Sequence, residues 1–215
     1  MKKTRFSPLA TVWSLAFFGA ASRGLAAGLP TPCLPGTCGP NGPAGFVSSG
    51  TATAAASGNQ LTVNQTSNQA ILNWSNFNVA AGSSVVFQQP AATSIALNRI
   101  FQGSPSSILG SITANGQIYL INPNGLIFGS TASVNASSIL ASTLGISDST
   151  FQSGLVSPAV INSQQPALAS DGRTGVVDLN GNPVLGSDGK QLPVQLQVQG
   201  GAQLAAASGG RILLA

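Results

Sequence analysis

The sequence predicts an all-β fold in which short strands stack as a parallel β-solenoid. Only 6% of the residues are charged, so amides, hydroxyls and glycine supply most of the polarity. Short β-prone runs alternate with Gly, Asn and Ser turn signals. Asn115-Gly116 and Asn124-Gly125 each precede an apolar run. A turn followed by an apolar run therefore recurs after nine residues, as it does in a stack of coils where each face ends in a corner of Gly or Asn.

The expected strands follow one another from residue 51 to the C-terminus. Helical periodicity is weak, and its best candidate, Ser137 to Leu144, is short and rich in Ser and Thr. We expect residues 46–80 to cap the open end of the first coil, with a turn at 57–59. The strand-like runs are Thr51 to Ala56, Leu61 to Thr66, Ala70 to Trp74, Ser84 to Phe87, Ile95 to Phe101, Gly116 to Ile121, Leu126 to Gly129 and Val194 to Val198.

Residues 1–26 have the three parts of a secretory signal peptide. Lys2, Lys3 and Arg5 form the charged part, the apolar run from Ser7 to Ala21 follows, and small residues near Ala26 suit cleavage. The apolar run is shorter than the ~20 residues that span a bilayer, so we expect cleavage rather than a transmembrane anchor. The protein is therefore expected to leave the cytoplasm.

Residues 27–45 are rich in Pro and Gly and predict an irregular lead-in to the first strands. They contain both cysteines of the chain, Cys33 and Cys38. In an exported protein this spacing favours one small structural disulfide loop. A metal site would need more ligands, and the chain has no His. We expect no metal and no cofactor.

The formal charge of +4 is carried by the leader. Four of the eight basic residues lie in the first 23 positions, and the remaining four are balanced by the four Asp residues (4 − 4 = 0). The mature chain is thus expected to be neutral, with no basic patch for phosphates. This excludes a nucleic-acid partner.

An excursion from the stack is predicted at residues 145–193, where the strand pattern breaks. Ser170 to Arg173 and Ser187 to Lys190 contain Asp-Gly pairs and predict two hairpin tips. Asp178 to Asn182 is weakly similar to a calcium loop, but Pro183 follows where such a loop needs Gly. Turn chemistry explains that stretch better.

Asn122-Pro123-Asn124-Gly125 is the most informative turn of the chain. Asn122 can accept a hydrogen bond from the backbone, Pro123 fixes φ, Asn124 suits the third position and Gly125 closes a type I turn. The flanking Ile118, Leu120, Leu126 and Phe128 would then point into one core.

The surrounding run resembles the amino-terminal secretion (TPS) domain of filamentous-haemagglutinin-type exoproteins, which Gram-negative bacteria export by two-partner secretion. The resemblance lies in Asn122 to Gly125 and in the upstream Leu97-Asn98-Arg99. Pro105 to Gly110, Ala114 to Gly116 and Asn73 to Phe77 match the family pattern as well. One departure is Gln88-Gln89-Pro90-Ala91, which stands where some members carry a second Asn-Pro-Asn turn.

The resemblance implies a right-handed parallel β-helix with a β-rich cap, spanning residues 46–215. It also implies recognition by the periplasmic domains of an outer-membrane transporter, with Asn122, Pro123, Asn124 and Gly125 as the recognition motif and Asn98 and Arg99 as further contributors. The chain would pass the periplasm, fold at the cell surface and nucleate a longer solenoid. It would then be secreted or stay at the cell surface as an adhesin, with a host-cell surface or matrix as its further partner.

Two other functions compete with this interpretation. A β-helix enzyme would need paired carboxylates or His, and the chain has no Glu, no His and four Asp. We therefore expect no enzyme. A stand-alone surface scaffold remains open, although the apolar run Arg211 to Ala215 ends in mid-strand. Such an end would leave an unpaired edge, so we expect the natural solenoid to continue further.

Overall fold

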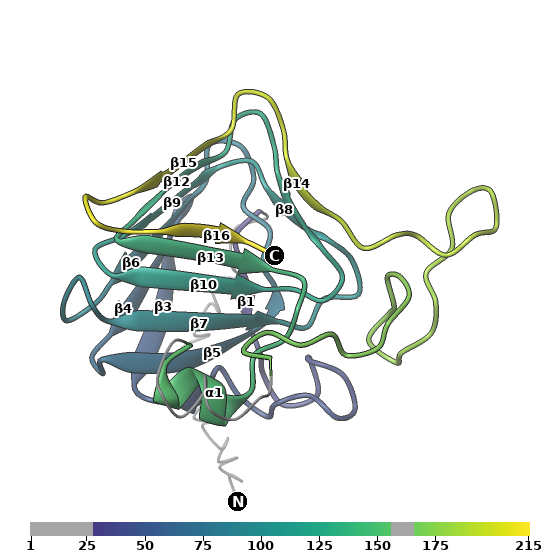
Figure 1. Ribbon diagram of the computed structural model, residues 1–215, viewed down its shortest axis with the longest axis horizontal. Helices are drawn as coiled ribbons and strands as arrows, with labels where there is room; N and C mark the ends of the chain where they lie inside the picture. The colour runs from purple at the N-terminus through teal and green to yellow at the C-terminus, as the bar shows by residue number, and fades with distance from the viewer. Residues whose placement is uncertain (1–27, 156–165) are drawn as a thin grey trace, which may run out of the picture.

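The computed structural model describes residues 28–155 and 166–215, and in them the chain winds as a parallel β-solenoid. The expected signal peptide lies outside the described residues. Each coil runs from left to right along one sheet in Figure 1 and returns through two others, while later coils lie nearer the viewer. This winding is right-handed, as is usual for parallel connections. No helix in the described ranges is long and apolar enough to cross a membrane.

Three sheets form the faces of the solenoid. Sheet A has the order β1-β5-β7-β10-β13-β16 with β2 also on β5, sheet B has the order β15-β12-β9-β6-β4-β3, and sheet C has the order β14-β11-β8. The strands of the coils are β4 (Gln60–Gln65), β5 (Gln69–Asn76), β6 (Ser84–Gln88), β7 (Ile95–Ile100), β8 (Ser106–Ile108), β9 (Ser111–Ala114), β10 (Gln117–Ile121), β11 (Leu126–Phe128), β12 (Ser133–Ala136), β13 (Ser138–Ser142), β14 (Leu196–Val198), β15 (Gln203–Ala206) and β16 (Ile212–Leu214).

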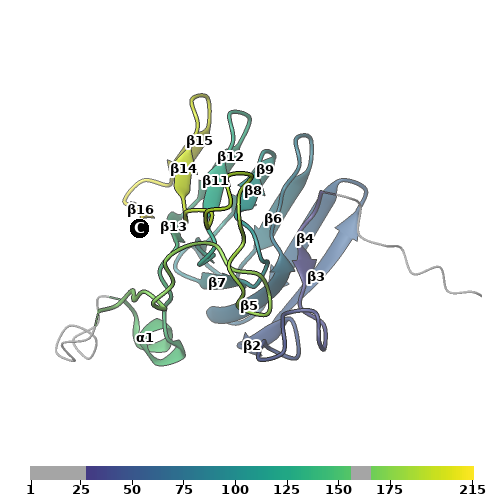
Figure 2. The same cartoon turned by 90° about the vertical axis from the view of Figure 1, so that its right-hand side faces the viewer.

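Three antiparallel strands cap the N-terminal end of the stack. They are β1 (Thr31–Pro32) and β2 (Val47–Ser49), which pair with β5, and β3 (Ala52–Ser57), which pairs with β4. Figure 2 shows β2 and β3 at one end of the solenoid and β14, β15 and β16 at the other. The prediction of a cap over 46–80 was too wide, because β4 and β5 already pair in parallel with the next coil. The lead-in over 28–45 is mostly turns and bends, with β1 as its strand.

The core fills the inside of the solenoid. Residues in register on neighbouring strands form columns, such as Leu72, Asn98, Leu120 and Ala141 across sheet A. Because side chains alternate along each strand, every second residue of a coil points inward. Trp74, Phe77, Phe87 and Phe128 are among the largest fully buried side chains of this core.

The excursion leaves the stack after β13 and returns at β14, as the broken pattern predicts. It begins with α1 (Asp148–Ser153), which Ser147 caps by accepting a hydrogen bond from the Thr150 N–H. Phe151 of α1 joins Ile71, Leu97, Ile121, Leu140 and Ile146 in a second apolar cluster on the outer face of sheet A. The helical alternative at Ser137 to Leu144 was wrong, since that segment contains β13.

The later part of the excursion consists of tight turns. The turn at 187–190 is a hairpin tip, flanked by a bridge between Leu185 and Gln191. A second tip forms at Asp178 to Asn182 rather than at Ser170 to Arg173, where the chain makes a turn without a flanking hairpin. Asp178 accepts hydrogen bonds from the N–H groups of Asn180 and Asn182, as turn chemistry predicts.

Candidate functional site

The Asn122 to Gly125 turn connects β10 of sheet A to β11 of sheet C. The Gly125 N–H donates to the Asn122 carbonyl at 2.9 Å, which closes a four-residue turn. The Asn122 side-chain oxygen accepts from the Asn124 N–H at 2.9 Å, as predicted. Gly125 has φ +116°, and a Cβ there would lie 2.6 Å from the Gln195 carbonyl oxygen. Only glycine fits this position without strain.

Asn122 is fully buried, and its whole carboxamide is used inside the chain. Its Nδ2 donates to Ser106 Oγ at 2.9 Å and to the Ser104 carbonyl at 3.2 Å. Since Ser104 and Ser106 belong to the preceding coil, Asn122 joins two coils at this corner. Its amide has no free face for a partner in the folded domain.

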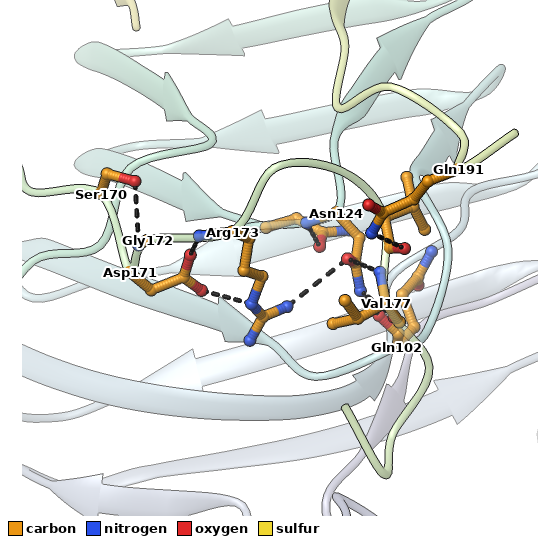
Figure 3. Close-up of polar contacts among 10 residues, drawn as sticks. Gln102, Asn124, Ser170, Asp171, Gly172, Arg173, Val177 and Gln191 are labelled. Atoms are coloured by element: carbon orange, nitrogen blue, oxygen red, sulfur yellow. Dashed lines mark hydrogen bonds and ion pairs between the residues drawn. The ribbon is translucent and has the colours of Figure 1, made fainter. Parts of the chain in front are cut away.

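Asn124 is only 4% exposed and binds the excursion (Figure 3). Its Nδ2 donates to the Gln102 carbonyl at 2.8 Å and to the Val177 carbonyl at 2.9 Å. Its Oδ1 accepts from the Val177 N–H at 2.9 Å and from Arg173 at 3.4 Å. The Asn124 carboxamide thus pairs with both polar groups of one residue, much as a neighbouring strand would.

Asn98 and Arg99, the other predicted motif residues, point to opposite sides of β7. Asn98 is buried in the core, where its Oδ1 accepts from the Trp74 indole N–H at 2.9 Å. Arg99 lies on the outer face, donates to the Ile146 carbonyl at 2.7 Å and pairs with Asp148 at 2.5 Å. Arg99 therefore fastens the α1 segment to sheet A, and neither residue lies at the Asn122 to Gly125 turn.

Sequence reasoning missed two buried glutamines that organise the corners between coils. The Gln102 side chain accepts from the Phe77 N–H at 2.8 Å and donates to the Pro105 carbonyl at 2.8 Å. Gln89, in the segment that departs from the family pattern, donates to Gln65 Oε1 at 3.1 Å and accepts from the Gly116 N–H. The signal in the sequence was a glutamine beside a turn, since its uncharged carboxamide can both donate and accept hydrogen bonds.

The described residues hold no group of three or more His, Cys, Asp and Glu side chains that could bind a metal. Cys33 and Cys38 are joined by a disulfide in the lead-in. Hydrogen bonds from Asn182 lower the pKa of the Asp178 carboxyl, and burial raises the pKa of the Tyr119 hydroxyl. Asp178 lies on a hairpin tip and Tyr119 against α1, and both positions suit structural roles.

Comparison with known proteins identifies the family of this chain. A family model described as the TPS secretion domain matches residues 44–214. Two heme/hemopexin-binding proteins of Haemophilus influenzae are 38% and 39% identical to 44% and 39% of this chain. The matched part is 10% and 9% of their length, so the match spans about a tenth of these curated relatives. The solved HMW1 secretion domain of Haemophilus influenzae is 36% identical, with 50% of this chain and 28% of that chain covered and a TM-score of 0.48.

Proposed function

The chain belongs to the TPS secretion domain family, and from that premise we propose that it is the export-targeting module of a larger Gram-negative exoprotein. In this proposal a cognate outer-membrane transporter recognises the chain in the periplasm through its periplasmic domains. The module then folds outside the cell. The exoprotein it belongs to is an adhesin that is released or stays at the cell surface.

The family match over residues 44–214 carries the proposal, and the burial of the motif indicates the stage at which the transporter would read it. Asn122 and Asn124 are 0% and 4% exposed, and every hydrogen-bonding atom of their side chains has a partner inside the domain. Because the fully folded turn offers no amide to a partner, the transporter would bind the motif before folding is complete. Folding at the surface would then withdraw the motif from it.

The exposed side chains of β16 support a second part of the proposal, a role in nucleating the solenoid. β14, β15 and β16 add a coil in register on β11, β12 and β13. The side chains of Ile212, Leu213 and Leu214 in β16 remain 42–48% exposed. A further coil in the same register would cover these side chains and be stabilised by the burial of their apolar surface.

The relatives' names do not assign this chain a ligand. They are named for binding heme or hemopexin, and the match covers about a tenth of them. We propose that this segment supplies export, while binding to a host-cell surface or matrix belongs to other parts of the exoprotein. A chain without His or Glu, whose charge balances once the leader is removed, suits a carrier better than a catalyst.

Co-expression of the chain with and without its transporter tests the proposal. We expect the chain in the medium only when the transporter is present, and we expect urea-unfolded chain to bind the transporter's purified periplasmic domains. Release into the medium without the transporter would overturn the proposal and favour a stand-alone surface scaffold.

A further inference from the structure

Residues 170–193 of the excursion, here called the latch, lie across the Asn122 to Gly125 turn. The latch holds the turn through Val177, whose N–H and carbonyl both bind the Asn124 carboxamide at 2.9 Å, and through Arg173 at 3.4 Å (Figure 3). Just beyond the latch, the Gln195 carbonyl accepts from the Leu126 N–H at 2.8 Å. The latch therefore covers the turn.

The latch backbone also packs closely against one glycine of the coils and one of the lead-in. A Cβ on Gly103 would lie 2.9 Å from Asp178 Cα, and one on Gly39 would lie 2.9 Å from the Leu179 carbonyl oxygen. These approaches place the Asp178 to Asn182 hairpin between the corner of the second coil and the disulfide loop. The fit at this surface depends on glycine having no side chain.

The latch has little apolar packing to keep it in place. Val176 is fully buried, whereas Leu179, Leu185 and Leu192 are 38–58% exposed. Its internal hydrogen bonds join Val176, Val184 and Leu192 to one another rather than to the coils. Segments with few buried apolar contacts open locally at a lower free energy than the core.

The hydrogen bonds that close the turn do not involve the latch. The Gly125–Asn122, Asn124–Asn122 and Asn122–Ser106 hydrogen bonds all lie within the coils. Opening the latch removes the partners of Asn124 Oδ1 and one partner of its Nδ2, which exposes that carboxamide. Because the latch follows the turn by about fifty residues, it can close only after that length of chain has become available.

We propose that the latch closes over the Asn122 to Gly125 turn once the coils have formed, and that closure ends the transporter's hold on the motif. This inference rests on the proposed function. The transporter recognises a chain whose Asn124 carboxamide is open, and the closed latch is the state it releases. An equilibrium that favours the closed state lowers the apparent affinity of folded chain in proportion to the open fraction.

The variant Val177→Pro tests the latch by changing a residue of the latch and none of the motif. The Val177 N–H binds Asn124 Oδ1 and makes no hydrogen bond within the hairpin, so Val177→Pro removes one of the two 2.9 Å latch contacts, weakens the latch and leaves the motif intact. Leu179→Pro is the matched control, because Leu179 is the second residue of the Asp178 to Gly181 turn, where proline is favoured. Binding of folded chain to the transporter's periplasmic domains is measured for both variants and the wild type.

We expect folded Val177→Pro to bind about tenfold more tightly than folded wild type and folded Leu179→Pro, as an open fraction raised about tenfold requires. If unfolded wild type binds but folded Val177→Pro binds no better than folded wild type, the latch inference is wrong and the proposed function stands. If unfolded wild type does not bind at all, the proposed function fails, and the latch as a release device fails with it.

Amide hydrogen exchange of the wild type decides the matter even if Val177→Pro does not fold. A latch that opens by itself lets the Val177 amide exchange faster than the amides of β10, because the coils stay closed. Equal rates at Val177 and in β10 would show that the segment opens only when the whole domain unfolds. That result would overturn the inference.

Discussion

Two asparagines, Asn115 and Asn124, make the same pairing at two corners of the solenoid with different consequences. Each precedes a glycine, and each binds the N–H and the carbonyl of one distant residue with its carboxamide. Asn115 pairs with Gln89 of the preceding coil at 2.7 Å in both contacts. Asn124 pairs with Val177 of the latch at 2.9 Å in both contacts.

The difference lies in burial and in the partner. Asn115 is exposed and joins two coils that the sheet ladders already hold together. Asn124 is buried and joins the stack to a segment with few buried apolar side chains. We therefore expect the exposed pairing of Asn115 to add less stability than the buried pairing of Asn124.

The glycines of the two corners give the largest expected effect. Gly125→Ala places a Cβ 2.6 Å from the Gln195 carbonyl at a φ of +116°, so we expect the free energy of unfolding to fall by roughly 3 to 5 kcal/mol. Gly116→Ala places a Cβ 2.6 Å from Gln89 Oε1 and 2.7 Å from the Ser94 carbonyl oxygen but needs no positive φ, so its loss should be smaller. Urea unfolding followed by circular dichroism measures both. Equal losses would mean that the conformation of Gly125 is not special.

Asn122→Ala has the next largest expected effect. It leaves the Asn124 N–H and Ser106 Oγ without this partner in a buried corner, which should cost about 2 to 4 kcal/mol of unfolding free energy. Ser137→Ala is a suitable control, since the Ser137 hydroxyl makes an exposed contact in a neighbouring corner. A loss below that of the control would contradict the role of Asn122 as the joint between coils.

We expect a smaller difference in stability between alanine variants of Asn124 and Asn115. Asn124→Ala should lower stability by about 2 kcal/mol, because buried groups lose their partners. Asn115→Ala should cost about 1 kcal/mol or less, since water can replace an exposed amide. Parallel urea titrations of the two variants measure these losses. If Asn115→Ala lowers the free energy of unfolding as much as Asn124→Ala, the contrast between the two corners is wrong.

The local strand pattern and the turn were predictable from sequence because both depend on neighbouring residues. Asn122 to Gly125 was recognised as a turn from its four residues, and its 4→1 hydrogen bond is present. The strands β4 to β7 lie within a residue or two of their predicted bounds. Alternation and turn residues carry this information over short distances.

The contacts that connect distant segments could not be predicted. The pairings of Asn115 with Gln89 and of Asn124 with Val177 depend on the register between coils and on the path of the excursion. The helix α1 has six residues, too few for a helical period, and it is fixed by Phe151 packing against the outer face of sheet A. Tertiary packing determined these features.

Acid should loosen the latch before the stack, which is the smallest expected effect. The pKa of Asp178 is lowered by its hydrogen bonds to Asn182 and Asn180, so the stabilisation is present above the unfolded-state pKa and is lost as pH falls through the folded-state pKa. The amides of Asn180 and Asn182 should therefore lose protection against hydrogen exchange below about pH 4, near the ordinary range of carboxyl pKa values. The amides of β9 should not change in step, and Asp178→Asn should abolish the transition. A simultaneous change in β9 would contradict the separation of latch and stack.

The most direct test of the central claim is export of matched variants by the cognate transporter. Asn124→Ala removes a carboxamide from the proposed recognition turn, Asn115→Ala removes one from the other corner, and Gly116→Ala lowers stability outside the turn. We predict that Asn124→Ala stays in the cell, while Asn115→Ala and Gly116→Ala reach the medium as the wild type does. Export of all three variants alike, or retention that follows the loss of stability, would contradict the claim that this turn directs export.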